Sequence, residues 1–365
     1  MNPDILILGG GVSGLSAALE LQHTGARVTI LERQSAGQES TWAGGGILSP
    51  LLPWHYSDAV VRLCHAGAQA YPTWLDALRE DATTDPEYIV SGMRVLAQTS
   101  DSAERLAWLA RTGDQFPLYA RQHPDSHDDS LWMPDIAQAR NPRLAAMLAQ
   151  VVRRRGIHLI EQAGDVRLTL QDDRVLHAES GSQRWHAGQY LVAAGAWSQA
   201  LIPVAPPTRA IRPVRGQMLL FHARPDTLTT ILYRQGTYLI PRQDGRILVG
   251  STLEEVGFDK STTAAARSEL TAIALSMLPA LESYAPEHHW SGLRPGSPGN
   301  LPTIARHPHI TNLYANTGHF RYGVTMAPAS ARLIADIMLD RPSAIDPEAY
   351  GWETPAPAPH PDRGD

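Results

Sequence analysis

One arginine lies on a backbone that the sequence makes unusually stiff. In the stretch SGLRPGSPGN, residues 291–300, Arg294 is followed directly by Pro295, and further glycines and prolines surround the pair. A planar guanidinium can bind a carboxylate through two parallel hydrogen bonds, and a fixed backbone would aim it at such a group. The stretch therefore predicts a carboxylate-binding site, with a structural salt bridge between domains as the alternative.

Two further side chains could act beside that arginine. Tyr238 lies in the β-run GTYLIPR, where strand alternation places it on the same face as Ile240. Arg321 lies in GHFRYGVTMAP, just before a helix that we expect to begin near Thr325. The positive end of that helix could stabilise negative charge. The structural alternatives are a core tyrosine and an arginine paired at a domain surface.

The first thirty residues read as one strand–helix–strand unit. Residues 5–8 form a short apolar run that predicts a buried parallel strand. Residues 13–24 have apolar positions at helical spacing, and Gly25 is expected to end that helix. Residues 27–31 predict a second strand, so the unit has the order of a nucleotide-binding βαβ fold.

The glycine spacing inside this unit is the strongest local signal. Gly9, Gly11 and Gly14 form a GxGxxG pattern. The first glycine permits a tight turn, the second lets a pyrophosphate approach the backbone, and the third lets the helix pack on the strand. The helix N-terminus then offers unpaired N–H groups to phosphates. Glu32 follows the second strand, where an acid binds a ribose hydroxyl, so we expect a bound dinucleotide.

A second glycine cluster bears on which dinucleotide is bound. After a polar loop the chain runs STWAGGGILSP, with three consecutive glycines at 44–46. A nicotinamide enzyme would continue at once into further βαβ units, whereas another close backbone approach suits a long, extended cofactor. The cluster favours FAD, with a flexible loop as the alternative.

Composition excludes several classes of function. A net charge of −6 gives no basic face for nucleic acid. No apolar run has membrane-spanning length, and no basic, apolar leader is visible, so we expect a cytoplasmic protein without a membrane partner. Cys64 is the only cysteine, and we expect it in a helix core. Lys260, the only lysine, lies in a polar loop, and the histidines lack metal-binding spacing, so Schiff-base and metal chemistry are not expected.

The order of predicted elements indicates an α/β fold with two interleaved domains. We expect a Rossmann-type nucleotide domain built from residues 1–60, 141–205 and 295–345. Residues 61–140 are expected to form a helical insertion belonging to the substrate domain. Residues 206–294 predict an antiparallel sheet that completes that domain, with a cleft against the nucleotide domain. Residues 346–365 are rich in proline, which predicts a flexible tail.

These motifs together resemble the FAD-dependent amino-acid oxidases, the family that includes D-amino-acid, sarcosine and glycine oxidases. The resemblance runs from residue 4 to about residue 340 and is nearest to the glycine oxidases of thiamine biosynthesis. The segments STWAGGGILSP, GLRPGSPGNLP and GHFRYGVTMAPA carry it. It implies a D-amino-acid-oxidase-like fold and FAD. The cofactor is expected to be non-covalent, because the late cysteine of sarcosine-oxidase-type enzymes has no counterpart here.

The resemblance also implies roles for individual residues. Arg294 is expected to bind the substrate carboxylate, Tyr238 to line the substrate pocket, and Arg321 to assist at the flavin or the substrate. The residues expected to hold FAD are Gly9, Gly11, Val12, Ser13, Gly14, Glu32, Arg33, Ser40, Thr41, Gly45, Gly46, Ile47, Val166, Gly195, His319, Phe320, Arg321, Tyr322, Gly323, Val324 and Thr325.

The implied reaction is oxidation of glycine, or of a small amine such as sarcosine or D-alanine, to an imine that hydrolyses to glyoxylate and ammonia. Molecular oxygen would be reduced to hydrogen peroxide. The implied assembly is a homo-oligomer, a tetramer by resemblance. One alternative is a D-amino-acid or proline-type dehydrogenase of the same fold that passes electrons to a quinone or carrier. Another is a flavin domain that modifies tRNA, which the acidic net charge disfavours.

Overall fold

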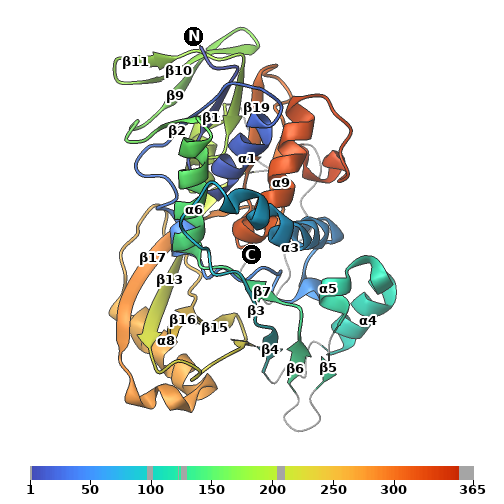
Figure 1. Ribbon diagram of the computed structural model, residues 1–365, viewed down its shortest axis with the longest axis vertical. Helices are drawn as coiled ribbons and strands as arrows, with labels where there is room; N and C mark the ends of the chain where they lie inside the picture. The colour runs from blue at the N-terminus through green and yellow to red at the C-terminus, as the bar shows by residue number, and fades with distance from the viewer. Residues whose placement is uncertain (1, 97–101, 122, 125–129, 204–209, 353–365) are drawn as a thin grey trace.

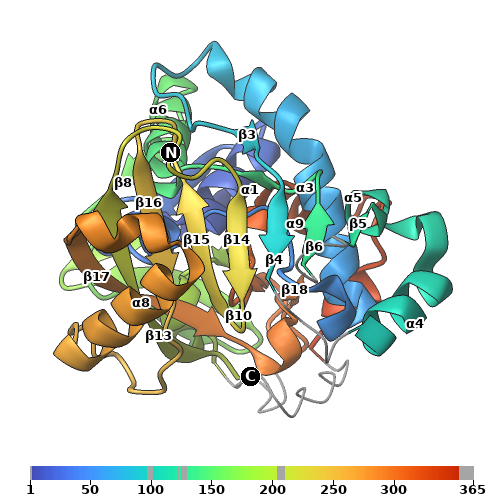
Figure 2. The same ribbon diagram turned by 90° about the horizontal axis from the view of Figure 1, so that it is seen from below.

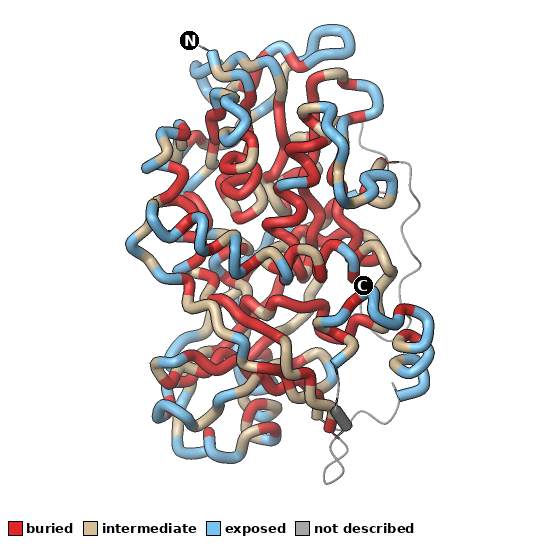
Figure 3. Tube along the Cα trace, turned by 45° about the vertical axis from the view of Figure 1, so that its right-hand side comes forward, coloured by how far each residue is buried: buried red, intermediate tan, exposed pale blue. Residues whose placement is uncertain are grey.

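The computed structural model describes residues 2–96, 102–121, 123–124, 130–203 and 210–352. Two large sheets form its upper and lower parts in Figure 1, joined by segments that cross between them several times. Figure 3 shows the buried chain running continuously through both parts. This is the mixed α/β, D-amino-acid-oxidase-like fold that the sequence predicted.

The upper sheet has six strands, and its central strands are buried on both faces. In spatial order they are β18 (Thr303–Arg306), β19 (Leu313–Thr317), β12 (Gln189–Val192), β1 (Ile5–Leu8), β2 (Val28–Leu31) and β8 (His158–Ile160). All run parallel except β18, which pairs antiparallel with β19. Parallel strands place their carboxyl ends at one edge of the sheet, where α/β proteins bind ligands.

Helices cover one face of this sheet and a small sheet covers the other. Helices α1 (Val12–Gln22), α6 (Asn141–Arg154) and α9 (Gly323–Met338) share a core with Ile5 and Ile7 of β1. Leu6 and Leu8 point the other way, into a core shared with the hairpin strand β10. That hairpin sheet consists of β9 (Arg167–Gln171), β10 (Arg174–Ser180) and β11 (Gln183–Trp185). The hairpin turns at residues 172–173.

The lower sheet has eight strands, five of them from residues 212–296. In spatial order they are β17 (Pro286–Gly296), β13 (Arg212–His222), β16 (Arg246–Gly250), β15 (Thr237–Pro241), β14 (Ile231–Arg234), β4 (Met93–Val95), β6 (Leu131–Met133) and β5 (His123–Pro124). Figure 2 shows α8 (Ala264–Met277) lying across this sheet. The last three strands come from the segment predicted to be a helical insertion, and β4 pairs parallel with β14. That segment therefore extends the antiparallel sheet, which its helical pattern did not reveal.

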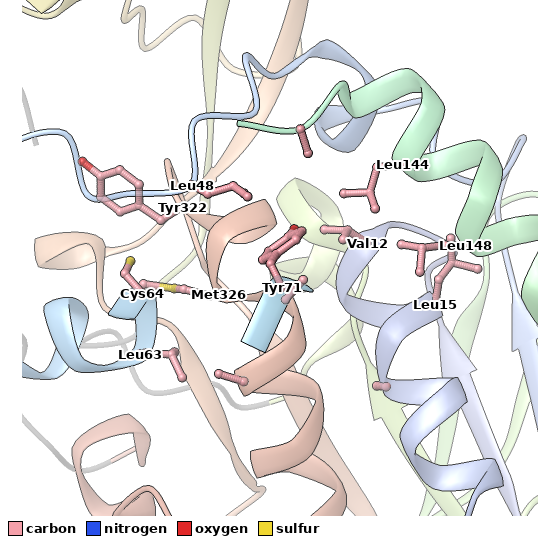
Figure 4. Close-up of a cluster of buried hydrophobic side chains, with 14 of the residues drawn as sticks. Val12, Leu15, Leu48, Leu63, Cys64, Tyr71, Leu144, Leu148, Tyr322 and Met326 are labelled. Carbon is pink, nitrogen blue, oxygen red and sulfur yellow. The ribbon is translucent and has the colours of Figure 1, made fainter. Parts of the chain in front are cut away.

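The long helix α3 (Asp58–Arg79) packs against α9 and α6 of the upper part. At Gly67 an added Cβ would lie 2.1 Å from the Thr325 carbonyl oxygen, so only glycine permits this close approach. Tyr71 Oη donates a hydrogen bond to the Val324 carbonyl (2.6 Å). Figure 4 shows Tyr71 and Met326 within the apolar cluster where the two helices meet. These contacts fix the first turn of α9.

The remaining elements are short and mostly connect the two parts. They are α2 (Ser40–Ala43), α4 (Ser102–Thr112), α5 (Pro117–Ala120), α7 (Ser198–Leu201), the paired strands β3 (Ile89–Val90) and β7 (Ala137–Gln138), and the 3₁₀ turns Pro53–His55, Gly113–Gln115, Gly195–Trp197, Pro279–Ser283, Pro298–Asn300 and Pro347–Tyr350. Within the described residues, no helix has the length and apolar character needed to cross a membrane.

The predicted flexible tail is wrong for residues 346–352. A 3₁₀ turn spans Pro347–Tyr350, and Tyr350 is fully buried with its Oη donating to the Ala59 carbonyl (2.9 Å). Trp352 is also buried and packs beneath the six-stranded sheet. Proline content suggested a tail, but two large aromatic side chains supply enough apolar area to hold this segment on the fold. Residues 353–365 lie outside the described residues.

This packing predicts a stability effect at Tyr350. We expect Tyr350→Ala to lower the free energy of unfolding by about 3–5 kcal/mol, because it leaves a large cavity. Tyr350→Phe removes only the hydrogen bond and is expected to lower it by about 1 kcal/mol. Urea unfolding of the two variants measures both values, and equal small effects would show that residues 346–352 do not contribute to the core.

Candidate active site

A cavity of about 570 Å³ opens between the two sheets. The carboxyl ends of β1 and β2 and the segment after β12 form its upper wall. Tyr238 of β15 and Arg294 of β17 come from the lower sheet, and the loop at residues 44–46 lies between. The cavity thus meets the parallel sheet at the edge where such sheets bind nucleotides.

The structure brings almost all of the predicted site residues to this one cavity. Its lining includes Arg294, Tyr238, Gly9, Gly11, Val12, Ser13, Glu32, Arg33, Ser40, Thr41, Gly45, Gly46, Ile47, Val166, Gly195, His319, Phe320, Arg321, Tyr322, Gly323, Val324 and Thr325. Gly14 does not line it. An added Cβ at Gly14 would lie 2.0 Å from the Gly9 carbonyl oxygen, so this glycine allows α1 to pack on the preceding turn.

The nucleotide end of the cavity is built from bare backbone. Gly9 has a φ of +115°, and an added Cβ would lie 2.5 Å from the Ala193 carbonyl oxygen. Helix α1 begins after Gly11 without a hydrogen bond from an N-cap side chain. Thr41 Oγ1 accepts a hydrogen bond from Val12 N (3.0 Å). A helix N-terminus with its N–H groups facing a cavity is a ready anion site.

Glu32 and Arg33 follow β2 and lie beside the nucleotide end of the cavity. Glu32 Oε2 accepts from Gly10 N (2.7 Å) and its Oε1 accepts from Gln34 N (2.9 Å). Arg33 lies over the ring of Trp197 with its Cζ 4.2 Å from the ring centroid. Trp197 in turn stacks on Phe258, with ring centroids 5.5 Å apart. The sequence analysis did not select either aromatic residue.

The glycine loop at 44–46 touches both sheets. An added Cβ at Gly45 would lie 2.6 Å from Ile240 Cδ1 and 3.1 Å from Tyr238 Cε2, so the loop passes directly over the strand face predicted from alternation. Gly46 has a φ of +79°, which glycine adopts readily. The hydroxyl of Thr325 donates to the Ile47 carbonyl (3.0 Å), which ties the loop to α9.

A buried arginine that the sequence analysis missed holds this loop in place. Arg242 Nη2 donates to the Gly45 carbonyl (2.7 Å), and its Nη1 donates to Gln138 Oε1 (2.6 Å) and the Ala139 carbonyl (3.3 Å). Burial lowers the pKa of Arg242 to about 10, so it remains a cation at neutral pH. Only three-dimensional proximity connects residue 242 to residue 45, and no local pattern could have identified it.

Arg294 lies on β17 with its guanidinium over a glycine of the neighbouring strand. An added Cβ at Gly216 would lie 2.2 Å from Arg294 Nη1, so that position must be glycine for the guanidinium to lie there. Arg294 Nη2 donates to Ser251 Oγ (2.5 Å) and its Nη1 donates to the Thr252 carbonyl (3.3 Å). Tyr238 Oη lies 3.2 Å from the same Ser251 Oγ. The predicted pair therefore meets through a serine that the sequence analysis did not select.

The segment before α9 brings a second arginine to the cavity. Phe320 has a φ of +43°, and its N–H donates to the Pro295 carbonyl (3.1 Å), which joins this segment to the residue after Arg294. Burial lowers the pKa of Arg294, and the charge of Arg321 contributes to the lowering. Helix α9 begins at Gly323, two residues earlier than predicted, because glycine at that position allows contact with His319.

Several buried polar atoms of the cavity wall have no hydrogen-bond partner among the described residues. They include His319 Nε2 and both amide atoms of Asn316. Burial lowers the pKa of His319 to about 4, so the imidazole is neutral at pH 7. Buried polar groups are normally paired, so this wall is suited to a polar ligand.

Comparison with known proteins agrees with this geometry. The family model of the FAD-dependent oxidoreductases called DAO matches residues 4–337. The chain belongs to the DAO family of FAD-dependent oxidoreductases. A glycine oxidase of Pseudomonas aeruginosa is 41% identical over 96% of this chain and 98% of its own length. A bifunctional protein ThiO/ThiG of Synechocystis is 31% identical over 93% of this chain and 52% of that relative. The crystal structure of a Bacillus cereus glycine oxidase superposes with a TM-score of 0.83 at 26% identity, covering 94% of this chain and 96% of that one.

The cofactor of this DAO-family chain is FAD, and the residues of the cavity fit it. Gly9 and Gly11 line the cavity with bare backbone, and the N-terminus of α1, where a pyrophosphate would bind, lies at the same end. The unpaired atoms of Asn316 and His319 suit the polar edges of a bound ring system. Cys64 is fully buried in α3 and does not line the cavity, so no cysteine is available for a covalent link.

Two other candidate chemistries have no support at this site. Lys260 is half-exposed and forms a salt bridge with Glu39 (3.0 Å), and it does not line the cavity. No cluster of three or more potential metal ligands exists in the part of the chain that the structure describes. The cavity therefore offers arginine side chains, carboxylates and neutral polar groups rather than an amine nucleophile.

The buried imidazole predicts an acid sensitivity. Because the pKa of His319 is about 4 in the folded protein against an ordinary 6.5, only the unfolded chain takes up this proton as the pH falls below 6.5. Between pH 7 and pH 5 this should lower the free energy of unfolding by about 2 kcal/mol. Urea unfolding at both pH values checks it. His319→Asn should lose that share of the pH dependence, and an unchanged slope in the variant would contradict the assignment.

Proposed function

We propose that this protein oxidises glycine, and small amines such as sarcosine or D-alanine, to the imine, which hydrolyses to glyoxylate and ammonia while oxygen is reduced to hydrogen peroxide. The observation that carries the proposal is the position of the Arg294 guanidinium, which lines the cavity. It donates a hydrogen bond to Ser251 Oγ, and the same oxygen is hydrogen-bonded to Tyr238 Oη. The similarity to glycine oxidases over nearly the full chain supports the choice of substrate.

In this proposal Arg294 binds the substrate carboxylate. Its guanidinium is held by Ser251 and Thr252 and lies over Gly216, so it meets the substrate in one orientation. A planar guanidinium and a carboxylate match each other in two hydrogen bonds, which fixes the direction of the Cα–H bond. Arg321 adds positive charge on the same side, and the Tyr238 ring closes the pocket against Gly45.

The FAD-binding residues proposed here are those of the cavity that the sequence predicted. The start of α1 and its glycines would hold the pyrophosphate, Glu32 the ribose, and the 40–47 segment and the start of α9 the flavin. When bound, FAD accepts the hydride equivalent from the substrate and delivers the electrons to oxygen.

The protein's main contribution is positioning rather than proton transfer. Holding two reacting groups in near-attack geometry contributes on the order of 7–11 kcal/mol to lowering a barrier. No obligatory general base of the protein is needed once the substrate amine is neutral. His319 stays neutral in its buried position, so it does not compete for the carboxylate.

The metabolic role, the cellular compartment and the assembly are further parts of this proposal. We propose that the product serves thiazole formation in thiamine biosynthesis, supported by the similarity to the ThiO part of a bifunctional ThiO/ThiG protein. We further propose a cytoplasmic homo-oligomer, with a tetramer as the specific expectation. Light scattering on the purified holoenzyme tests the assembly, and a monomer would overturn it.

The decisive experiment is an aerobic peroxide assay on the purified holoenzyme with glycine, sarcosine, D-alanine and D-proline. We expect peroxide with glycine at a rate at least as high as with the other three. Bleaching of the flavin by an amino acid without peroxide would replace the oxidase with a dehydrogenase that uses another acceptor.

A substitution separates substrate binding from cofactor binding. We expect Arg294→Ala to lower kcat/KM for glycine by roughly 10²- to 10³-fold, because the carboxylate loses its charged partner in a desolvated pocket. The FAD content, read from the visible spectrum, should be unchanged. Arg294→Lys keeps the charge but loses the planar fork, so it should recover only part of the activity. Loss of FAD from both variants would show that Arg294 is structural.

A further inference from the structure

The Ser251 hydroxyl, which the proposed function uses only as a support for Arg294, lies at the substrate end of the cavity. Ser251 follows β16 directly and lines the cavity together with Arg294 and Tyr238. Its Oγ is 2.5 Å from Arg294 Nη2 and 3.2 Å from Tyr238 Oη. Ser251 is therefore hydrogen-bonded both to Arg294, which is proposed to bind the substrate carboxylate, and to Tyr238, which is proposed to line the substrate pocket.

The hydrogen bonds of Ser251 and Tyr238 leave one of their two hydroxyl hydrogens available to a ligand in the cavity. Arg294 can only donate, so it occupies one lone pair of Ser251 Oγ. Between the two hydroxyls of Ser251 and Tyr238 a single hydrogen bond forms, and one of the two hydroxyl hydrogens remains. The other neighbour of Tyr238 Oη is Met218 Sδ at 3.5 Å, which is a weak acceptor. In either arrangement one hydroxyl hydrogen lacks a strong acceptor among the described residues.

The next residue shows what a purely structural hydroxyl looks like here. Thr252 Oγ1 accepts from Gln217 N (2.8 Å) and donates to Glu254 Oε1 (2.5 Å), so both of its functions are used within the protein. Thr252 does not line the cavity. The hydroxyls of Ser251 and Thr252 thus differ in two ways. Thr252 uses its donor and its acceptor within the protein, whereas Ser251 lines the cavity where a ligand would bind.

Ser251 also restrains the guanidinium. Arg294 has a second attraction, toward the carboxylate of Glu254, which is bound by Arg215. The hydrogen bond to Ser251 and the bond to the Thr252 carbonyl together hold the guanidinium over Gly216 on the cavity side. Without Ser251 the guanidinium would lose its shorter hydrogen bond and keep the longer one to the Thr252 carbonyl, beside its contact with the Tyr238 hydroxyl.

We propose that Ser251 is a substrate-positioning residue: it fixes Arg294 and, with Tyr238, directs a hydroxyl hydrogen toward the substrate carboxylate that Arg294 binds. The carboxylate is then held by the guanidinium and by a neutral donor from a different strand. This proposal rests on the proposed function only for the identity of the substrate. It requires only that the ligand carry a carboxylate.

The test compares Ser251→Ala with the wild-type holoenzyme. Glycolate and acetate serve as carboxylate probes, titrated through the change they cause in the flavin absorbance, which needs no turnover. Hydrogen bonds to charged groups are strong, so the Kd of both probes and the KM for glycine should rise roughly ten- to hundredfold. The limiting rate of anaerobic flavin reduction by glycine should stay within about twofold, because Arg294 still orients the bound substrate and the contact of the unreacting carboxylate with Ser251 is the same before and during the reaction.

Two further variants make the result specific. Ser251→Thr keeps the hydroxyl and should return the Kd of the probes toward the wild-type value, even if Ser251→Ala folds poorly. Ser276→Ala removes an exposed hydroxyl of α8, far from the cavity lining, and should change neither Kd nor KM.

Several results would overturn the proposal. An unchanged or tighter Kd in Ser251→Ala would mean that Ser251 is idle or competes with the substrate for Arg294. A lower limiting reduction rate at unchanged Kd would place the hydroxyl in the redox step instead. If wild-type protein binds the probes but does not oxidise glycine, the substrate assignment fails while the Ser251 proposal stands. If wild-type protein binds no carboxylate, both the clamp and the Ser251 proposal fail.

Discussion

The buried guanidinium of Arg242 is the interaction on which the geometry of the site depends. It reaches from the end of β15 to the carbonyl of Gly45 and to Gln138, so it joins the lower sheet, the glycine loop and the connection before α6. A buried cation needs hydrogen-bond partners, and the two Nη atoms of Arg242 donate three hydrogen bonds to these groups, whereas its Nε has no partner among the described residues. Arg242 thereby holds the loop at residues 44–46, which is expected to lie along the flavin, beside the strand that carries Tyr238.

Glycines act throughout as points where two elements meet without a side chain between them. Gly14 lets α1 pack on its own turn, Gly67 lets α3 reach α9, and Gly216 leaves space for the Arg294 guanidinium. At Gly14 and Gly67 an added Cβ would lie within about 2.1 Å of a backbone carbonyl oxygen, so an alanine there would require a backbone shift, whereas at Gly216 it would displace the Arg294 guanidinium. These glycines therefore determine how closely the helices, the strands and the Arg294 side chain approach one another.

The electrostatics of the cavity favour an anion at one end. Arg294 and Arg321 bring two cations close enough that the second lowers the pKa of the first, while His319 remains neutral. Two neighbouring cations repel each other in a desolvated space, and a bound carboxylate relieves that repulsion. At the other end, the N-terminus of α1 offers partial positive charge to phosphates. The cavity thus has two places that favour an anion.

Local sequence alone determined the nucleotide-binding unit. The strand, the GxGxxG turn, the helix and Glu32 follow each other within about thirty residues, and short-range sterics and periodicity suffice to specify them. The stiff backbone around Arg294 was likewise visible, as was the strand face of Tyr238. The family resemblance, rather than spacing, supplied the residues of the 40–47 and 319–325 segments.

Tertiary structure decided what joins these pieces. Arg242 contacts a loop almost two hundred residues away, and Ser251 meets Arg294 across strands, so neither has a local signature. The three strands from residues 93–133 join the lower sheet through the pairing of β4 with β14, and each is only two or three residues long, which is too short to show a periodic pattern. Tyr350 and Trp352 are fixed by surfaces that exist only after the sheets have formed. Sequence determines elements whose contacts are close along the chain, whereas contacts between distant segments form only once packing has chosen which faces meet.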